Sequence, residues 1–183
     1  ETNLRMTGKD DTKDFQHATE LCNNSEEIFS KVKDLLCTYD LGIQDIIIEE
    51  KLVLNESTGD EVSRLLPMFI HSMNGEEYKL PIWLESSGTQ SAFYMLAMIA
   101  ERLRCGGVSI LDEFDNDLHP QLTQEIIELF KLEHSNERNA QLIFTTHTPE
   151  VLNMLRKQHC YLVEKTSCIS EAWRIDEIEG LKE

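Results

Sequence analysis

The pattern of apolar and polar positions changes once along this chain, near Thr89. Before that residue, a helical repeat over residues 25–38 gives way to β-rich stretches between residues 43 and 83. After it, helix-like and strand-like segments alternate to the end, which is typical of a parallel α/β sheet. We therefore expect an α/β fold, with parallel strands and flanking helices preceded by a helix and a small β-rich region.

The segment before Thr89 predicts one helix and three strands. Residues 25–38 place apolar side chains on one face of a helix. Residues 43–54 form a β-rich run, and LLPMFIHSM and EEYKLPIW lie on either side of Asn74-Gly75, a dipeptide typical of hairpin turns. Residues 1–24 are polar and mixed in charge, so we expect a loose terminus or part of an arm there.

From Thr89 onward the first helix is apolar on most sides and should be largely buried, and Gly106-Gly107 ends it. The two later helices each carry a proline in the first turn, where no N–H donor is needed. The expected elements are, in chain order, the helix TQSAFYMLAMIAERLR, the strand VSILDE, the helix PQLTQEIIELFKL, the strand AQLIFTTH, the helix TPEVLNMLRK and the strands CYLVEK and EAWRI.

The charge balance narrows the classes of partner. There are 34 Asp and Glu residues against 17 Lys and Arg, a net charge of −17. Proteins that bind nucleic acid usually present a basic face to the phosphates, so we do not expect this segment to bind nucleic acid directly. The length of 183 residues suits one domain or one lobe of a larger one, and 40% hydrophobic residues suffice for a packed core.

The cysteines and the chain ends bear on the compartment. Five cysteines without CxxC or Cys/His metal spacing suit a reducing environment better than a disulfide framework. No run in the sequence is long and apolar enough to span a membrane, and no signal peptide is recognisable. We expect a cytoplasmic protein. Since the first residue is Glu1 rather than Met, we expect a fragment of a longer protein, and a natural half-protein stays open as the alternative.

A buried strand leads into two adjacent acids, Asp112 and Glu113. In α/β folds, ligands bind at the edge where the parallel strands end, and these carboxylates are expected there. Neighbouring residues of an extended segment point to opposite sides, so one acid could face a Mg²⁺ ion and the other a water molecule. The alternative is a pair of acids that simply ends a strand in solvent.

A second apolar strand ends at His147, again at the expected ligand edge. A histidine there could donate a hydrogen bond to a phosphate oxygen or act as an acid or base. A purely structural histidine is the alternative.

The stretch ESSGTQ puts small polar residues, Ser86, Ser87 and Gly88, directly before a helix. Free N–H groups and the helix dipole favour an anion at such a position, and glycine would let a phosphate approach the backbone. An ordinary helix N-cap explains the same residues.

The order of these three motifs is more specific than any one of them. ESSGTQ, an apolar strand ending in Asp-Glu and an apolar strand ending in Thr-Thr-His follow one another. The chain resembles the C-terminal half of an ABC-type ATPase head, as in the SMC, RecF and OLD-like groups. DLGIQDIIIEE and LVEK look like the AAA-like ATPases of prokaryotic phage-defence and abortive-infection systems. The resemblance covers residues 40–165 and implies a P-loop NTPase fold with ATP and Mg²⁺ as cofactors.

The resemblance implies roles for two loops that would meet a partner head. Residues 85–90 match the ABC signature, which acts in trans on nucleotide held by the partner. FDNDLHP, residues 114–120, matches the D-loop region. The residues expected to contact ATP in these two loops are Ser86, Ser87, Gly88, Thr89, Asn116 and Asp117.

The resemblance also implies the catalytic residues. Residues 110–113 look like the Walker B strand, which makes Asp112 the carboxylate on the Mg²⁺ side and Glu113 the catalytic base. His147 falls at the position of the switch histidine.

One motif of such heads is missing from this chain. A P-loop, GxxxxGK[ST], cradles the phosphates with backbone N–H groups and a lysine, but the single Gly-Lys pair, Gly8-Lys9, is followed by Asp10. In the resembling heads the P-loop lies in an N-terminal half, beyond a long helical insertion. The partners implied are therefore the chain's own P-loop lobe, or a chain that supplies it, and a second head in a homodimer or higher homo-oligomer.

We accordingly expect residues 1–42 to form a helical, arm-proximal segment and residues 43–183 the C-terminal lobe of an ABC-type ATPase. Hydrolysis of ATP between dimerised heads would gate an attached or associated effector, such as a toxin or nuclease, in anti-phage defence. Two alternatives stay open. One is a nucleotide-regulated scaffold that restrains a toxin or nuclease, and the acidic surface fits a basic partner. The other is the ATPase part of an OLD-type nuclease, since residues 178–183 faintly resemble the start of its metal-binding domain.

Overall fold

The computed structural model describes residues 2–4, 11–39, 42–54, 60–115 and 118–178. The chain divides into two compact units, residues 1–145 and 146–183. The boundary between these units is not the boundary expected between residues 42 and 43. The expected division into a helical, arm-proximal segment and a lobe stays a prediction.

A parallel sheet lies in the first unit. Its strands are β1 (Thr2–Leu4), β5 (Val108–Leu111) and β6 (Gln141–Phe144), in the order β1-β5-β6. Both pairings are parallel, and Ile110 lies opposite Ile143. The predicted α/β fold with parallel strands is confirmed. The strand β1 was not predicted, because it has only three residues and lies in a polar segment.

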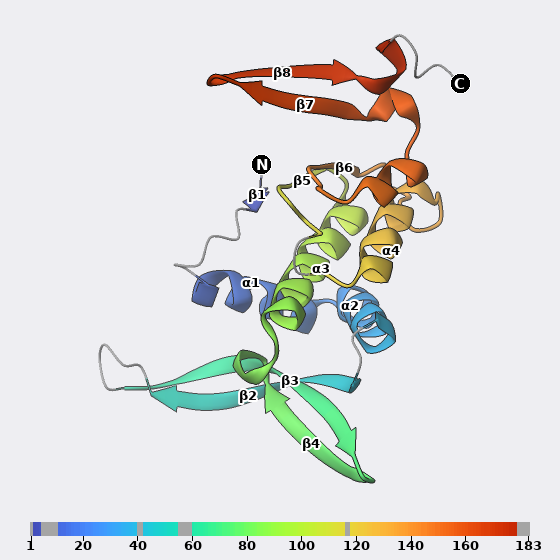
Figure 1. Ribbon diagram of the computed structural model, residues 1–183. Helices are drawn as coiled ribbons and strands as arrows, with labels where there is room; N and C mark the ends of the chain where they lie inside the picture. Colours follow the sequence, from blue (N-terminus) through green and yellow to red (C-terminus); the bar gives the residue numbers. More distant parts are fainter. Residues whose placement is uncertain (1, 5–10, 40–41, 55–59, 116–117, 179–183) are drawn as a thin grey trace. The chain divides into compact units, whose positions relative to one another are not determined.

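The helix α3 (Ser87–Cys105) runs through the middle of the first unit (Figure 1). Every residue from Ser91 to Ala100 is buried, as its apolar sequence predicted. The other helices of this unit are α1 (Asp11–Asn24), α2 (Glu26–Tyr39) and α4 (Pro120–Lys131).

For residues 11–24, the helix α1 rules out the loose terminus, which was one of two expectations for this segment; the other, a helical, arm-proximal segment, stays a prediction. Cys22 follows Ala18 by four residues and Thr19 by three, so the three side chains share one face of the helix. Each is at most 2% exposed. This burial raises the pKa of the Cys22 thiol to about 12. The stripe consists of small side chains among polar ones, so its hydrophobic signal is weak even though it packs closely.

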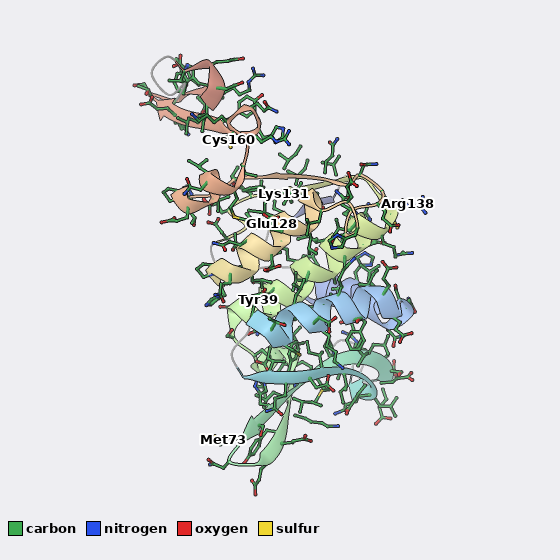
Figure 2. The ribbon with its side chains drawn as sticks, turned by 90° about the vertical axis from the view of Figure 1, so that its right-hand side faces the viewer. Tyr39, Met73, Glu128, Lys131, Arg138 and Cys160 are labelled. Atoms are coloured by element: carbon green, nitrogen blue, oxygen red, sulfur yellow. The ribbon has the colours of Figure 1, made fainter. Side chains whose placement is uncertain are left out.

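An antiparallel sheet covers the other side of this helical layer. It contains β2 (Ile43–Leu54), β3 (Glu61–Met73) and β4 (Glu76–Pro81), with β3 in the centre. Asn74 and Gly75 both have positive φ, 56° and 85°, as a tight hairpin turn requires. Figure 2 shows Met73 at the tip of this hairpin, where it is 60% exposed.

The second unit consists of short helical turns and a hairpin. The hairpin pairs β7 (Tyr161–Thr166) with β8 (Ile169–Arg174), and both strands were expected. The α-helix expected at residues 148–157 is wrong: the chain forms 3₁₀ turns at Pro149–Met154 and Lys157–His159. The Thr148 side chain makes no capping bond, and so short a segment propagates poorly as an α-helix.

One face of the parallel sheet is apolar and open. Ser109 and Leu111 point into the core and are 5% and 4% exposed. On the opposite face Val108 and Ile110 are each 41% exposed and Ile143 is 55% exposed. Parallel sheets are normally covered on both faces. We call Val108, Ile110 and Ile143 the open face.

No helix in the described ranges is both long and apolar enough to cross a membrane.

Phe93 on α3 packs against Phe69 on β3, and removing this contact tests the packing of the helix on the antiparallel sheet. Both side chains are fully buried, and their rings meet edge to face with centroids 5.9 Å apart. We expect Phe93→Ala to lower the free energy of unfolding by about 3–5 kcal/mol, because it leaves a cavity that the surroundings fill only in part. Met73→Ala, at an exposed site, should change it by less than about 0.5 kcal/mol. Urea denaturation followed by circular dichroism measures both, and equal effects would contradict the described core.

Candidate functional site

The residues Asp112 and Thr145 come together at the carboxyl edge of the parallel sheet. Asp112 follows β5 directly and Thr145 follows β6 directly. The ladder continues past the strand ends, because the Thr145 N–H donates to the Leu111 carbonyl at 3.0 Å. This is the edge at which ligands bind in such sheets.

The Thr145 hydroxyl connects the two acids. It donates a hydrogen bond to Asp112 Oδ1 at 2.6 Å and accepts one from the Glu113 backbone N–H at 2.7 Å. One side chain therefore fixes a carboxylate and the backbone of the next residue at once. The Thr-Thr-His run is recognisable in the sequence, but nothing there assigns Thr145 a role, because its partners lie more than 30 residues away.

Glu113 does not continue the strand. Its φ is +49°, in the left-handed region that non-glycine residues rarely adopt. The expectation that Asp112 and Glu113 lie in one extended segment is thus wrong. Residues held in this region cost about 1–3 kcal/mol and cluster at functional sites, and here the Thr145 hydroxyl bond helps to hold the turn.

Phe114 anchors the other end of the turn. It is 4% exposed, and its ring packs against Phe144 with centroids 4.7 Å apart and planes at 62°. The Phe114 N–H also points to the Thr145 carbonyl, at 3.4 Å. The two exposed acids are therefore carried on a turn whose next residue is buried.

The stretch ESSGTQ begins α3. Ser86 is the N-cap, and its hydroxyl accepts the Thr89 N–H at 3.1 Å and lies 2.9 Å from Thr89 Oγ1. Ser87 is exposed, Gly88 is half-buried and Thr89 is 4% exposed. The ordinary N-cap anticipated as an alternative is thus present, and it leaves Ser87 at the surface of the first turn.

A histidine that the sequence did not single out meets this stretch. His71 Nε2, on β3, lies 2.7 Å from Glu85 Oε1, and the Glu85 side chain is only 7% exposed. The Glu85 carbonyl in turn accepts a hydrogen bond from Gln90 Nε2 at 2.8 Å. Nothing in the sequence connects two residues 14 positions apart on different elements.

The ESSGTQ stretch and the residues Asp112 and Thr145 lie apart in the structure. ESSGTQ lies at one end of α3, and β5 follows the other end (Figure 1). A helix of 19 residues is about 28 Å long, and the four residues of β5 return by only about 13 Å. The chain therefore carries two separate groups of candidate residues, one at the start of α3 and one at Asp112 and Thr145, which we call the two half-sites.

Three predicted site residues remain, and the structure says little about their surroundings. Asn116 and Asp117 lie outside the described residues. His147 is exposed and belongs to the second unit, two positions after Thr145 in the sequence.

The donor set at Asp112 fits Mg²⁺ and not a metal held by protein alone. No cluster of three or more His, Cys, Asp or Glu side chains suited to a metal occurs in the part of the chain that the structure describes. Mg²⁺ typically takes one or two carboxylates and completes its shell with water and phosphate oxygens. Asp112 is exposed and oriented by the Thr145 hydroxyl, so it can supply such a carboxylate.

Solved structures show the same fold. Forty-one chains match. One comes from a study of ATP-driven dimerisation and DNA-stimulated activation of SMC ATPases: it is 14% identical, with a TM-score of 0.52, over 85% of this chain and 88% of that one. The Smc head domain of Pyrococcus furiosus, with an extended coiled coil and bound to the C-terminal domain of ScpA, is 13% identical, with a TM-score of 0.50, over 81% of this chain and 34% of that one.

A third structure, an Smc head bound to the C-winged helix domain of ScpA, is 12% identical, with a TM-score of 0.53. The match covers 90% of this chain and 52% of that one. The chain thus spans about a third and about half of the two Smc heads. No curated protein matches the sequence.

A family match extends over most of the chain. Residues 13–153 match the family described as "AAA domain, putative AbiEii toxin, Type IV TA system". This agrees with the resemblance to ABC-type heads and abortive-infection ATPases that the motifs indicated, and with the SMC-like fold. The chain belongs to this AAA-domain family.

Proposed function

We propose that this chain is the C-terminal lobe of an ABC-type ATPase head that binds and hydrolyses Mg-ATP. The observation that carries the proposal is the Thr145 hydroxyl, which holds Asp112 and the Glu113 backbone together at the carboxyl edge. An ATPase needs one carboxylate for the metal and another group for the attacking water. Family membership and the SMC-like fold support the nucleotide chemistry.

Each site residue has a role in this proposal. Asp112 holds Mg²⁺, which neutralises charge on the phosphates when bound. Glu113 accepts a proton from the water that attacks the γ-phosphate as the bond to the β–γ bridging oxygen breaks and ADP leaves, and the turn that carries Glu113 sets its position. His147 donates a hydrogen bond to a phosphate oxygen, a role that rests on the sequence resemblance.

The signature half-site serves a different nucleotide. Ser86, Ser87, Gly88 and Thr89 sit at the start of α3, where N–H groups and the helix dipole favour an anion. Because they lie at the far end of α3 from Asp112, we propose that they contact ATP held by a second head. Asn116 and Asp117 would approach the same interface. The SMC ATPase that dimerises on ATP offers a precedent for this arrangement.

The open face supports the need for another lobe. Val108, Ile110 and Ile143 expose apolar side chains on a parallel sheet, a surface that is costly to leave in water. We propose that the P-loop lobe, from the same protein or another chain, covers it. That lobe would also bring the lysine and backbone N–H groups that this sequence lacks.

We further propose that nucleotide-driven head closure gates an effector in anti-phage defence. The family description, which mentions a toxin and a toxin–antitoxin system, supports a connection with defence. The scaffold alternative retains one favourable observation: a net charge of −17 suits a basic protein partner. The Smc heads bound to ScpA show that heads of this fold can also carry a partner protein.

Replacing Glu113 by glutamine tests the proposed base. With the P-loop lobe present, we expect Glu113→Gln to lower kcat by roughly 10²–10⁴-fold, because the water loses its proton acceptor. ATP should still bind and accumulate unhydrolysed on the protein. A phosphate-release assay and filter binding of labelled ATP measure both effects. Glu137→Gln, on an exposed loop, is the matched control, and normal turnover by Glu113→Gln would refute the assigned role.

The Thr145 hydroxyl can be removed at almost constant volume. We expect Thr145→Val to lower the apparent affinity for Mg²⁺ roughly 10–100-fold in the ATPase assay, as is typical when a hydrogen-bond partner of a metal ligand is lost. Thr145→Ser keeps the hydroxyl and should retain most of the affinity. A Mg²⁺ titration at saturating ATP separates the two variants, and equal curves would show that the bond to Asp112 is irrelevant to the metal.

The open face predicts where the P-loop lobe binds. Ile110→Asp puts a charge on that face without touching the core, so it should abolish co-purification of this chain with a tagged P-loop lobe. Leu52→Asp, at a site 69% exposed on the antiparallel sheet, is the control and should co-purify normally. Circular dichroism confirms that both variants fold. Undiminished capture of Ile110→Asp would place the lobe elsewhere.

A further inference from the structure

We propose that His71 is a positioning residue for the signature half-site: it acts through Glu85 to hold the start of α3 in the geometry that engages nucleotide. This inference rests on the proposed function, because it assigns a partner outside the motif to the signature residues. The hydrogen bond of His71 goes to Glu85 and not to the signature serines, which is why we assign it a positioning role.

The pair is mostly withdrawn from water. His71 Nε2 and Glu85 Oε1 lie 2.7 Å apart, and the two side chains are 24% and 7% exposed. A carboxylate buried to this degree needs a donor, since leaving it unpaired costs far more than a surface ion pair contributes. Neutral or protonated, the imidazole can present an N–H at this position. Among the described residues, His71 supplies this partner to the Glu85 carboxylate.

Glu85 is tied to the signature through its backbone as well as its side chain. Its N–H donates to the Ile82 carbonyl at 3.1 Å, and its carbonyl accepts from Gln90 Nε2 at 2.8 Å. The next residue, Ser86, caps α3 and accepts the Gln90 N–H at its carbonyl at 3.0 Å. The 3₁₀ turn, the cap and the first helical turn are thus joined at Glu85.

The other end of the pair is on the central strand of the antiparallel sheet. His71 lies in β3, opposite Ile43 on β2 and Tyr78 on β4. Next to it, Gly42 has a φ of +115°, and a Cβ built there would lie 3.5 Å from His71 Nδ1. Because strands on both sides hold His71 in place, a shift of this sheet passes to Glu85 and from there to Ser86. The chain therefore has a built connection between the antiparallel sheet and the proposed head-to-head surface.

Three variants separate positioning from bulk stability. His71→Leu removes the donor and leaves the Glu85 carboxylate unpaired. His71→Gln keeps a side-chain N–H donor of similar reach and should restore the contact. His134→Leu, at an exposed loop position, is the control.

The first readout needs no nucleotide. In the 183-residue chain, we expect His71→Leu to raise amide hydrogen exchange in a peptide covering residues 85–90 by on the order of tenfold, the size of effect that follows loss of one partner of a buried hydrogen bond. Exchange in residues 93–100 should change much less. His71→Gln should return the peptide close to wild type. Uniformly faster exchange throughout α3 in His71→Leu would show a loss of general stability and overturn the inference.

The second readout uses the head assembled with its P-loop lobe. Signature residues act on the partner's ATP after the heads close, so His71→Leu should lower kcat on the order of tenfold while the Kd of one head for ATP is unchanged. Rescue of kcat by His71→Gln is expected. Wild-type turnover by His71→Leu, with altered exchange in residues 85–90, would overturn the positioning role and leave the proposed ATPase intact. An assembled wild-type head without ATPase activity would instead refute the proposed function, and the exchange data would still report on the His71–Glu85 contact.

Discussion

The burial of α3 is the constraint on which the rest of this structure depends. Its residues from Ser91 to Ala100 are all hidden from solvent, so the helix must be covered on every side. The helices α1 and α2, the strand β5 and the antiparallel sheet contribute to that cover. The two half-sites begin at the two ends of this one buried element, which fixes their separation regardless of what the surface loops do.

Single polar side chains complete each half-site. At the carboxyl edge, Thr145 joins Asp112 to the backbone of Glu113, whose left-handed conformation the chain would otherwise avoid. At the start of α3, His71 meets the buried carboxylate of Glu85. Both contacts bring in an element distant in sequence, and both orient a neighbouring residue rather than form the surface that meets a ligand.

The open face and the missing P-loop support the same proposal. A parallel sheet with one apolar face exposed, and a carboxylate without a phosphate-binding loop in this sequence, are what we would expect of a lobe that functions with another. A net charge of −17 favours solubility and opposes non-specific self-association, because like charges repel.

The sequence by itself determined the alternation of helices and strands from Thr89 to Phe144, the burial of α3 and the hairpin at Asn74-Gly75, because these depend on local periodicity and turn chemistry. It did not locate α1 within the helical segment expected for residues 1–42, because the small side chains of α1 give little hydrophobic signal, and it failed for residues 148–157, where no cap supports an α-helix. Only the tertiary structure decided that Glu113 leaves the extended conformation and that Thr145 and His71 support the two half-sites. These contacts join residues 14 to 33 positions apart on different elements, and such pairings are fixed by how the elements pack rather than by any pattern along the chain.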